Sequence, residues 1–381
     1  MDNRRAYQIL NLLPGIGPMR VAQLLSLFSS PAAILAASAA ELARVPGIGG
    51  KLAATIADWE KQCDLDRELA MVEQAGVLVL TREDSDYPAL LAEIHDPPLC
   101  LYVRGAPAAV ARTRGGIAIV GSRRTTSYGT MMAERLATAA SVAGWPVVSG
   151  LARGIDAVAH RAALTAGGTT VAVLGCGLAY VYPQENLDLA RRIVAEGGAL
   201  VSEFPMTCRP DKRNFPMRNR IISGLTRGTI VVEAGFESGS LITAATALDQ
   251  GRSVFAVPGR VDSPQSRGCH ALIRDGARLV ESFQDVAEEF SGLPGLDLAV
   301  ESDRGAATCR KPSPDLTLTD LERKLLSLLD ENETAIDALI VAAGESPAQV
   351  LSTLLLLEMK RLVKQLPGRR VVRSSGGVVA E

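Results

Sequence analysis

A regular alternation between strand-like and helix-like segments dominates the chain from residue 116 to about residue 290. Short runs rich in Val, Ile and Thr alternate there with amphipathic stretches of helical period, a pattern typical of a parallel sheet covered by helices. The runs that we interpret as strands are residues 117–120, 147–149, 170–174, 199–202, 229–233 and 253–257. We therefore predict an α/β fold with an extended Rossmann-like, doubly wound parallel sheet at its centre.

Smaller helical segments flank this pattern. The repeated motifs Leu13-Pro-Gly-Ile-Gly17 and Val45-Pro-Gly-Ile-Gly49 indicate a helical, helix-hairpin-helix or SAM-like domain in residues 1–80, whose turns would contact either phosphate or protein. Expected helices at 316–329, 334–343 and 346–362, with a strand pair in 366–372, predict a winged helix in residues 316–381. The aperiodic residues 291–315 indicate a linker, which leaves 81–290 as the Rossmann-like domain.

Composition narrows the class of protein. The 40 basic and 42 acidic residues nearly cancel, so a nucleic-acid site would have to be a local basic patch. No apolar run reaches the roughly 18 residues of a membrane span, and no cleavable leader is recognisable, so we expect a cytoplasmic protein without a membrane partner. The six scattered cysteines form no CxxC pair, and we expect no metal site.

Glycine-containing turns follow three of the expected strands, and each opens a helix. The candidate binding residues are Gly121, Ser122, Arg123 and Arg124 in the first turn, Gly150, Arg153 and Gly154 in the second, and Ser238, Gly239 and Ser240 in the third. Parallel strands end at one edge of the sheet, so the turns should converge. Backbone N–H groups, hydroxyls and arginines together suit a phosphate, although the serines also suit helix capping.

The densest basic stretch of the central segment spans residues 209–220 and contains a single acid, Asp211. Its candidate binding residues are Lys212, Asn214, Phe215, Arg218 and Asn219. Cations for the phosphates and a ring on which a base stacks are what single-stranded nucleic acid needs. The alternative is a solvated loop anchored by a core Phe215. Because Pro216 biases its predecessor towards an extended backbone and suits the first turn of a helix over 218–225, we expect Phe215 to stack on a base.

Catalytic and cofactor motifs are missing from the positions where this kind of sheet would carry them. The first strand is not followed by GxGxxG, and neither GxxxxGK[ST] nor GxSxG occurs, so we expect no cofactor and no catalytic residues. Asp156 and His160 lie one helical turn apart, but capping and internal hydrogen bonding explain such a pair better than acid–base catalysis. We therefore expect a binding protein and not an enzyme.

Several short motifs also occur in a characteristic order between residues 81 and 280. They are Val120-Gly-Ser-Arg123, Tyr128-Gly129, Val148-Ser-Gly-Leu-Ala-Arg-Gly-Ile-Asp156 with His160, Val173-Leu-Gly-Cys-Gly177, Tyr182-Pro183, Phe215-Pro-Met-Arg-Asn-Arg-Ile-Ile222, Ser238-Gly-Ser240 and Phe255-Ala-Val-Pro-Gly259. Together they make the chain resemble the DNA-processing protein A family, also called DprA or Smf.

The resemblance implies an activity that composition and periodicity do not show. It implies a homodimer that binds single-stranded DNA without sequence choice, and double-stranded DNA more weakly. It also implies that the protein protects incoming DNA and loads the RecA recombinase during natural transformation and recombination. The family's DNA pocket would map to Arg123, Lys212 and Phe215, with Arg218 and Asn219 beside them.

Two other functions stay open at this stage. Related Rossmann-like folds include phosphoribohydrolases that cleave nucleotides with a PGGxGT turn, a pattern that the sequence Glu233-Ala-Gly-Phe-Glu-Ser-Gly-Ser240 lacks. A transcription factor could instead use the winged helix. Its expected recognition helix has no Arg or Lys in residues 346–358, which makes a poor surface for phosphates and bases, and an apolar core explains its leucines better.

Overall fold

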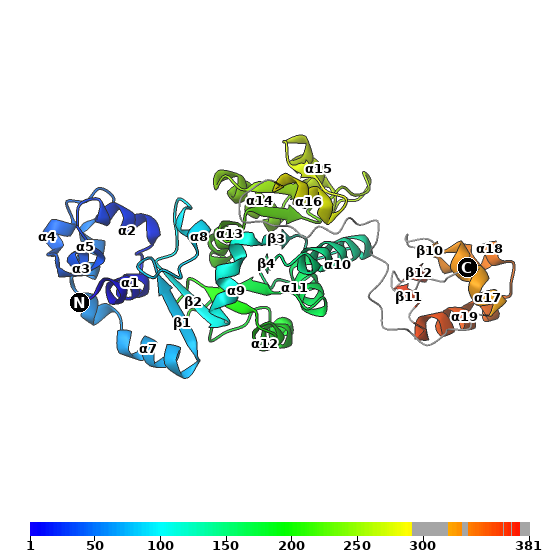
Figure 1. Ribbon diagram of the computed structural model, residues 1–381, viewed down its shortest axis with the longest axis horizontal. Coiled ribbons are helices and arrows are strands. Elements are labelled where there is room, and N and C mark those ends of the chain that lie inside the picture. Colours follow the sequence, from blue (N-terminus) through cyan, green and yellow to red (C-terminus); the bar gives the residue numbers. More distant parts are fainter. Residues whose placement is uncertain (292–318, 330–333, 361, 367, 374–381) are drawn as a thin grey trace. The chain divides into compact units, whose positions relative to one another are not determined.

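The computed structural model describes residues 1–291, 319–329, 334–360, 362–366 and 368–373, and forms two compact units, Met1–Val300 and Glu301–Glu381 (Figure 1). The predicted linker lies almost entirely outside the described residues. Among the residues that are described, no helix is both long and apolar enough to cross a membrane.

Short helices form the N-terminal part of the first unit. They are α1 (Asn3–Leu12), α2 (Pro18–Leu25), α3 (Pro31–Ala36), α4 (Ala39–Leu42), α5 (Gly50–Ala57), α6 (Trp59–Gln62) and α7 (Leu65–Gln74). The two repeated hairpin motifs end just before α2 and α5, as expected. Side-chain caps begin several of these helices, including a capping box between Ser38 and Glu41 at α4.

A nine-stranded sheet follows in the order β1-β2-β6-β5-β4-β3-β7-β8-β9. Its strands are β1 (Val77–Thr81), β2 (Cys100–Gly105), β3 (Ile117–Val120), β4 (Val147–Ser149), β5 (Thr170–Val173), β6 (Ala199–Ser202), β7 (Gly228–Val231), β8 (Ser253–Ala256) and β9 (Arg278–Leu279). All pairs from β6 to β9 are parallel, whereas β1 and β2 add an antiparallel edge. The six predicted strands are therefore confirmed, and β1, β2 and β9 were not predicted.

Helices cover both faces of this sheet (Figure 1). They are α8 (Ala89–Ala92), α9 (Pro107–Arg112), α10 (Ser127–Val142), α11 (Ile155–Thr165), α12 (Leu187–Ala195), α13 (Asn214–Gly224), α14 (Gly239–Asp249), α15 (Arg267–Arg274) and α16 (Phe283–Glu289), with 3-10 turns η1 (Thr113–Gly115) and η2 (Gln184–Asn186). Because strand side chains alternate between faces, Ile117 and Ile119 pack with α10, α11 and α16, whereas Ala118 and Val120 pack with α13, α14 and α15.

The N-terminal helices share a core with the antiparallel end of the sheet. Leu10 of α1 and Tyr102 of β2 belong to the same buried cluster. The Asn11 side chain donates to the Glu203 carbonyl at 3.2 Å, and the Met206 amide donates to the buried Glu68 carboxylate at 2.7 Å. The helical region is thus attached to the sheet by apolar packing and by buried polar contacts.

The second unit has the arrangement of a winged helix. Its elements are α17 (Asp320–Leu328), β10 (Thr334–Ala335), α18 (Ile336–Ala343), α19 (Pro347–Met359), β11 (Val363–Leu366) and β12 (Arg370–Arg373), with strand order β10-β12-β11. Residues 334–335 form a strand where we expected the start of a helix, because they pair with β12. Val350, Leu354 and Leu357 of α19 are fully buried, whereas Leu351, Leu355 and Leu356 are exposed, so the core explains only part of the leucines of this helix.

Candidate nucleic-acid interface

The three glycine-containing turns meet at the carboxyl edge of the parallel strands. The Ser122 amide of the β3–α10 turn donates to the Glu233 carbonyl after β7 at 2.7 Å, and the Ile155 amide after β4 donates to the Ser122 carbonyl at 3.2 Å. Gly154 has φ +72°, and its Cα lies so close to the Ser122 carbonyl that a Cβ could not fit. The convergence expected from the sequence is therefore present.

The predicted site residues divide into exposed and buried sets. Exposed side chains belong to Arg123, Arg124, Arg153 and Lys212, and Phe215 and Asn214 are half-buried. Buried side chains belong to Ser122, Arg218, Asn219 and Ser240. Gly121, Gly150, Gly154, Ser238 and Gly239 supply backbone in the three turns. The exposed and half-buried side chains can reach a ligand directly, and the buried ones cannot.

An arginine and two aromatic rings lie together among the side chains that can reach a ligand. The guanidinium carbon of Arg123 lies 5.5 Å from the centroid of the Phe215 ring. The Tyr182 ring, which follows β5, lies 5.6 Å from the Phe215 ring with an interplanar angle of 34°. Tyr182 is 49% exposed. We did not single out Tyr182 as a site residue, although its position after the third predicted strand places it at the same sheet edge.

The backbone of Phe215 differs from the prediction. We expected an extended residue ahead of a helix over 218–225, but α13 begins at Asn214 and includes Phe215. Asp211 makes this early start possible, because its backbone and side chain accept from the Asn214 and Arg213 amides at 3.1 and 2.8 Å. Pro216 costs no hydrogen bond there, since the first four amides of a helix have no partner within it.

Phe215 packs with one side against the backbone after β5. A Cβ on Gly175 would lie 2.9 Å from Cδ1 of the Phe215 ring, so the glycine is needed for this approach. The ring is therefore neither a free loop side chain nor a fully enclosed core residue. Its remaining surface is shared with Tyr182 and Arg123.

Some cations at this edge of the sheet are already paired with carboxylates of the protein, which partly neutralises their charge towards a ligand. Arg153 pairs with Glu185 at 2.8 Å, and Arg213 pairs with Asp211 at 3.0 Å. Hydrogen bonds from Arg213 lower the pKa of Asp211 to about 2, so that carboxylate stays charged. Within the described residues, no carboxylate pairs with Arg123 or Lys212. Arg124 likewise has no carboxylate partner there, so these three cations keep a charge that no internal carboxylate offsets.

Two predicted binding residues support the turns from below. Arg218 is 4% exposed, and its guanidinium donates to the Gly150 carbonyl at 2.5 Å and also to the Val173 carbonyl. Asn219 donates to the Gly239 carbonyl at 3.3 Å. Burial lowers the pKa of Arg218 to about 10, a value at which the guanidinium is still charged at neutral pH. Both side chains thus tie α13 to the neighbouring turns.

Internal carboxylates occupy several of the amides that we expected to face a phosphate. The buried Glu233 carboxylate accepts from the Thr126 amide at 3.0 Å and from the Thr125 hydroxyl at 3.0 Å, at the start of α10. Asp156 accepts from the Gly150 and Ala152 amides at 3.1 and 3.3 Å. A carboxylate is itself the anion that a helix N-terminus favours. The expectation was wrong for these amides, so phosphate binding here depends on side-chain cations.

Asp156 and His160 do not pair with each other. The His160 Nδ1 atom lies 2.7 Å from the Thr170 hydroxyl, and the imidazole is fully buried. Burial lowers the pKa of His160 to about 3, so the ring is neutral at physiological pH. Burial also raises the pKa of Asp156, an effect that Arg218 opposes. Each side chain thus has its own structural partners.

The third turn caps a helix, as its serines suggested. The Ser238 hydroxyl accepts from the Ser240 amide at 3.4 Å and lies 2.7 Å from the Ser240 hydroxyl at the start of α14. This arrangement positions the turn against α13 and the first turn.

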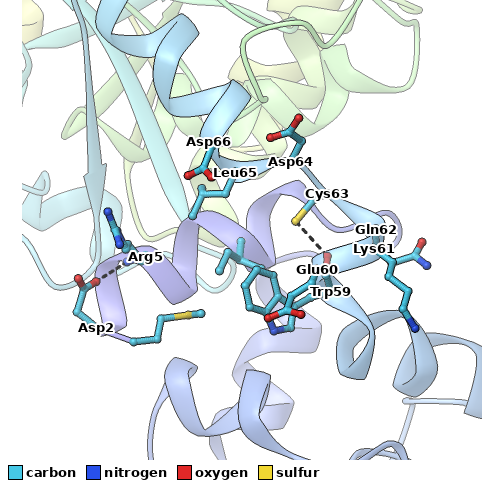
Figure 2. A pocket seen from close by; sticks show the side chains of 12 residues that line it. Asp2, Arg5, Trp59, Glu60, Lys61, Gln62, Cys63, Asp64, Leu65 and Asp66 are labelled. Carbon is cyan, nitrogen blue, oxygen red and sulfur yellow. Dashed lines mark hydrogen bonds between the residues drawn. The ribbon is translucent and has the colours of Figure 1, made fainter.

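A separate open pocket lies among the N-terminal helices (Figure 2). Trp59 lines it together with the charged residues Asp2, Arg5, Glu60, Lys61, Asp64 and Asp66. The carboxylates outnumber the cations, and a phosphate would be repelled. This pocket therefore does not compete with the sheet edge as a nucleic-acid site.

Sequence comparison identifies all three parts of the chain. Residues 78–291 match the family described as DNA recombination-mediator protein A. Residues 310–369 match the DprA winged helix domain, and residues 8–58 match a SAM-like helix-hairpin-helix tandem. Protein Smf of Synechocystis sp. is 34% identical over 399 residues, which cover 98% of this chain and 99% of that protein.

Solved structures agree with this comparison. The X-ray structure of DNA processing protein A from Streptococcus pneumoniae has a TM-score of 0.65 and 36% identity, over 74% of this chain and 97% of that one. DNA processing protein A from Helicobacter pylori has a TM-score of 0.50 and 28% identity, over 56% of this chain and 95% of that one. The Helicobacter pylori structure was reported for the insight that it gives into how that protein binds single-stranded DNA.

Proposed function

Since the chain belongs to the DNA recombination-mediator protein A family, also named DprA or Smf, we propose that it binds single-stranded DNA without choosing among sequences. The exposed group of Arg123, Phe215 and Tyr182 carries this proposal. A base can stack on the rings whatever its identity, because every base has a π-face. Lys212 and Arg123 supply charge for the phosphates. The single-stranded DNA binding mode described for the Helicobacter pylori relative also supports the proposal.

Binding would require a movement of Arg123. Its side chain is exposed, so the guanidinium can turn from the Phe215 ring to a phosphate when a base takes its place on the ring. Arg218 and Asn219 stay beneath and hold the second and third turns in position. The proposed roles are thus direct contact for Arg123, Lys212, Phe215 and Tyr182, and support for the buried pair.

We extend the proposal to the cellular role that family membership suggests. The protein would act in the cytoplasm as a homodimer, bind double-stranded DNA more weakly, protect incoming DNA and load RecA during natural transformation. The Rossmann-like domain of residues 81–290 would supply the main DNA affinity. Residues 316–381, joined to it by the linker of residues 291–315, would contribute protein contacts or regulation, and the turns of residues 1–80 would contact either phosphate or protein.

A salt titration tests the proposal. Binding of labelled oligothymidine should weaken linearly in log affinity against log salt, with a slope of about −0.7 for each phosphate that is neutralised. Oligomers of mixed sequence should bind within a few-fold of oligothymidine. Binding that is indifferent to salt, or confined to one sequence, would contradict the proposal.

Nucleotide cleavage of the phosphoribohydrolase type is the alternative from another class of function. Glu233, the carboxylate at the end of β7, is 3% exposed and is already hydrogen-bonded at the start of α10, which favours a structural role. Incubation with nucleoside monophosphates provides the test. Release of free base at a rate that depends on the protein would favour the enzyme.

A further inference from the structure

A second exposed aromatic ring lies on the same sheet edge. Phe236 is 63% exposed and belongs to a tight turn after β7, which the Ser238 amide closes by donating to the Gly235 carbonyl at 3.1 Å. A fully buried phenylalanine would stabilise the protein by removing its ring from water, and at this position most of that gain is absent. The turn is thus a place where a partner can cover the ring.

The turn that carries Phe236 is attached to the proposed DNA site on two sides. Glu233 lies three residues before the ring, and its backbone carbonyl accepts a hydrogen bond from the Ser122 amide of the Arg123 turn at 2.7 Å. Gly239, three residues after the ring, accepts from Asn219 of α13 at 3.3 Å, and α13 also carries Phe215. The backbone of the Phe236 turn is therefore held in a defined position relative to the first aromatic group.

Strand order places Phe236 further along the same edge. Tyr182 follows β5, and the neighbouring strands towards Phe236 are β4, β3 and then β7. Three spacings of about 4.8 Å separate β5 from β7, or about 14 Å in all. This separation is longer than one nucleotide step of an extended strand, so the two aromatic positions would take bases of one strand that are not adjacent, with Arg123 of the β3 turn between them.

Two cations without a carboxylate partner among the described residues belong to segments whose backbone contacts the Phe236 turn. Arg124 follows Arg123 in the first turn, and Arg267 starts α15 next to Gly268, where a Cβ would lie 3.0 Å from the Gly235 carbonyl. Both side chains are exposed, and within the described residues no carboxylate pairs with either. Arg124 and Arg267 therefore add positive charge to the segments next to the Phe236 turn, whereas Glu237 is an opposing charge within the turn.

We propose that Phe236 is a second stacking platform for the same DNA single strand, with Arg124 and Arg267 as phosphate ligands. This inference rests on the proposed function. The strand passes from the Phe215 group across the first turn and onto the Phe236 turn. Stacking at the second ring adds affinity without adding base preference, as at the first.

Oligomer length distinguishes the two platforms in the full-length protein. With oligothymidine of about 16 nucleotides, Phe236→Ala should weaken binding by roughly 5- to 150-fold, the factor for one stacked base, whereas Phe236→Trp should keep it. With a thymidine dinucleotide, whose single step is shorter than the separation of the two rings, Phe236→Ala should change affinity less than about twofold. Glu237→Gln should strengthen binding of the longer oligomer.

Val142→Ala is the matched control, because Val142 is 77% exposed at the end of α10, on the opposite edge of the sheet. Val142→Ala should change the affinity for neither the longer nor the shorter oligomer. Arg123→Ala should weaken both oligomers, and a lack of effect at both lengths would overturn the proposed function itself. If Arg123→Ala weakens both while Phe236→Ala weakens neither, the second platform alone is wrong. A change in sedimentation of Phe236→Ala at unchanged DNA affinity would assign the ring to a protein interface and also overturn the inference.

Discussion

Replacing Phe215 by alanine removes a ring that has contacts on two sides. One side packs on the backbone at Gly175, and the rest of the ring meets Tyr182 and Arg123. The replacement therefore affects both folding and DNA binding, and the two effects have different sizes.

The effect on folding follows from the partial burial of the ring. Truncation of a fully buried phenylalanine costs about 3–5 kcal/mol. Phe215 is half-buried, so we expect the free energy of unfolding to fall by about 2 kcal/mol, including the lost ring pair with Tyr182, which is worth about 0.5–1.5 kcal/mol. The melting temperature should drop by about 4–8 °C, and the protein should stay folded.

The effect on binding follows from the loss of one stacked base. Stacking contributes about 1–3 kcal/mol, so oligothymidine affinity should fall by roughly 5- to 150-fold. Phe215→Trp should largely preserve affinity, since it keeps an aromatic face. Phe215→Leu is the matched control for packing, because it retains apolar volume against Gly175 without a π-face, and it should melt near the wild type but bind weakly.

Thermal melting and fluorescence anisotropy on the same protein samples give both quantities. Unchanged affinity of a folded Phe215→Ala protein would refute stacking. A loss of about 4 kcal/mol in stability, typical of an enclosed core ring, would refute the partial burial on which the reasoning depends.

Charge, pH and the C-terminal unit provide three further predictions. Arg123→Ala and Lys212→Ala should each weaken binding and reduce the salt slope by about 0.7 with little change in melting temperature, and unfolding of either mutant would show a structural role instead. Burial lowers the pKa of His160 from 6.5 to about 3, so the unfolded state binds more protons between these values. The free energy of unfolding should therefore fall as pH drops below 6.5, by at most ~1.4 kcal/mol per pH unit from this group. His160→Gln should reduce that slope in denaturant titrations, and an identical slope would count against the buried neutral ring. Deleting residues 316–381 should leave oligothymidine affinity within a few-fold, and a folded truncation that no longer binds would contradict this expectation.

The parallel strands and the turns at their ends could be predicted because their signals are local. Strand-forming runs such as residues 117–120 and glycine turns such as 121–124 depend on neighbouring residues, and helix periodicity repeats within a few turns. The antiparallel strands β1 and β2 escaped prediction. Their identity depends on pairing across the chain, Tyr102 with Ser202 for example, and sequence periodicity does not record such a partner.

Which side chains face a ligand was decided by the tertiary structure. The sequence by itself determined that cations, glycines and an aromatic ring follow these strands. The strand order β5-β4-β3-β7 decides three contacts that the sequence does not show. Arg218 donates to the second turn, the Glu233 carboxylate accepts at the start of α10, and the Tyr182 ring lies against the Phe215 ring. These contacts join residues that are far apart in the chain. A charged side chain is available to a ligand only where no residue of the protein already pairs with it. Tertiary structure therefore buried Arg218, paired Arg153 and Arg213 with carboxylates, and left Arg123, Arg124 and Lys212 exposed without a carboxylate partner among the described residues.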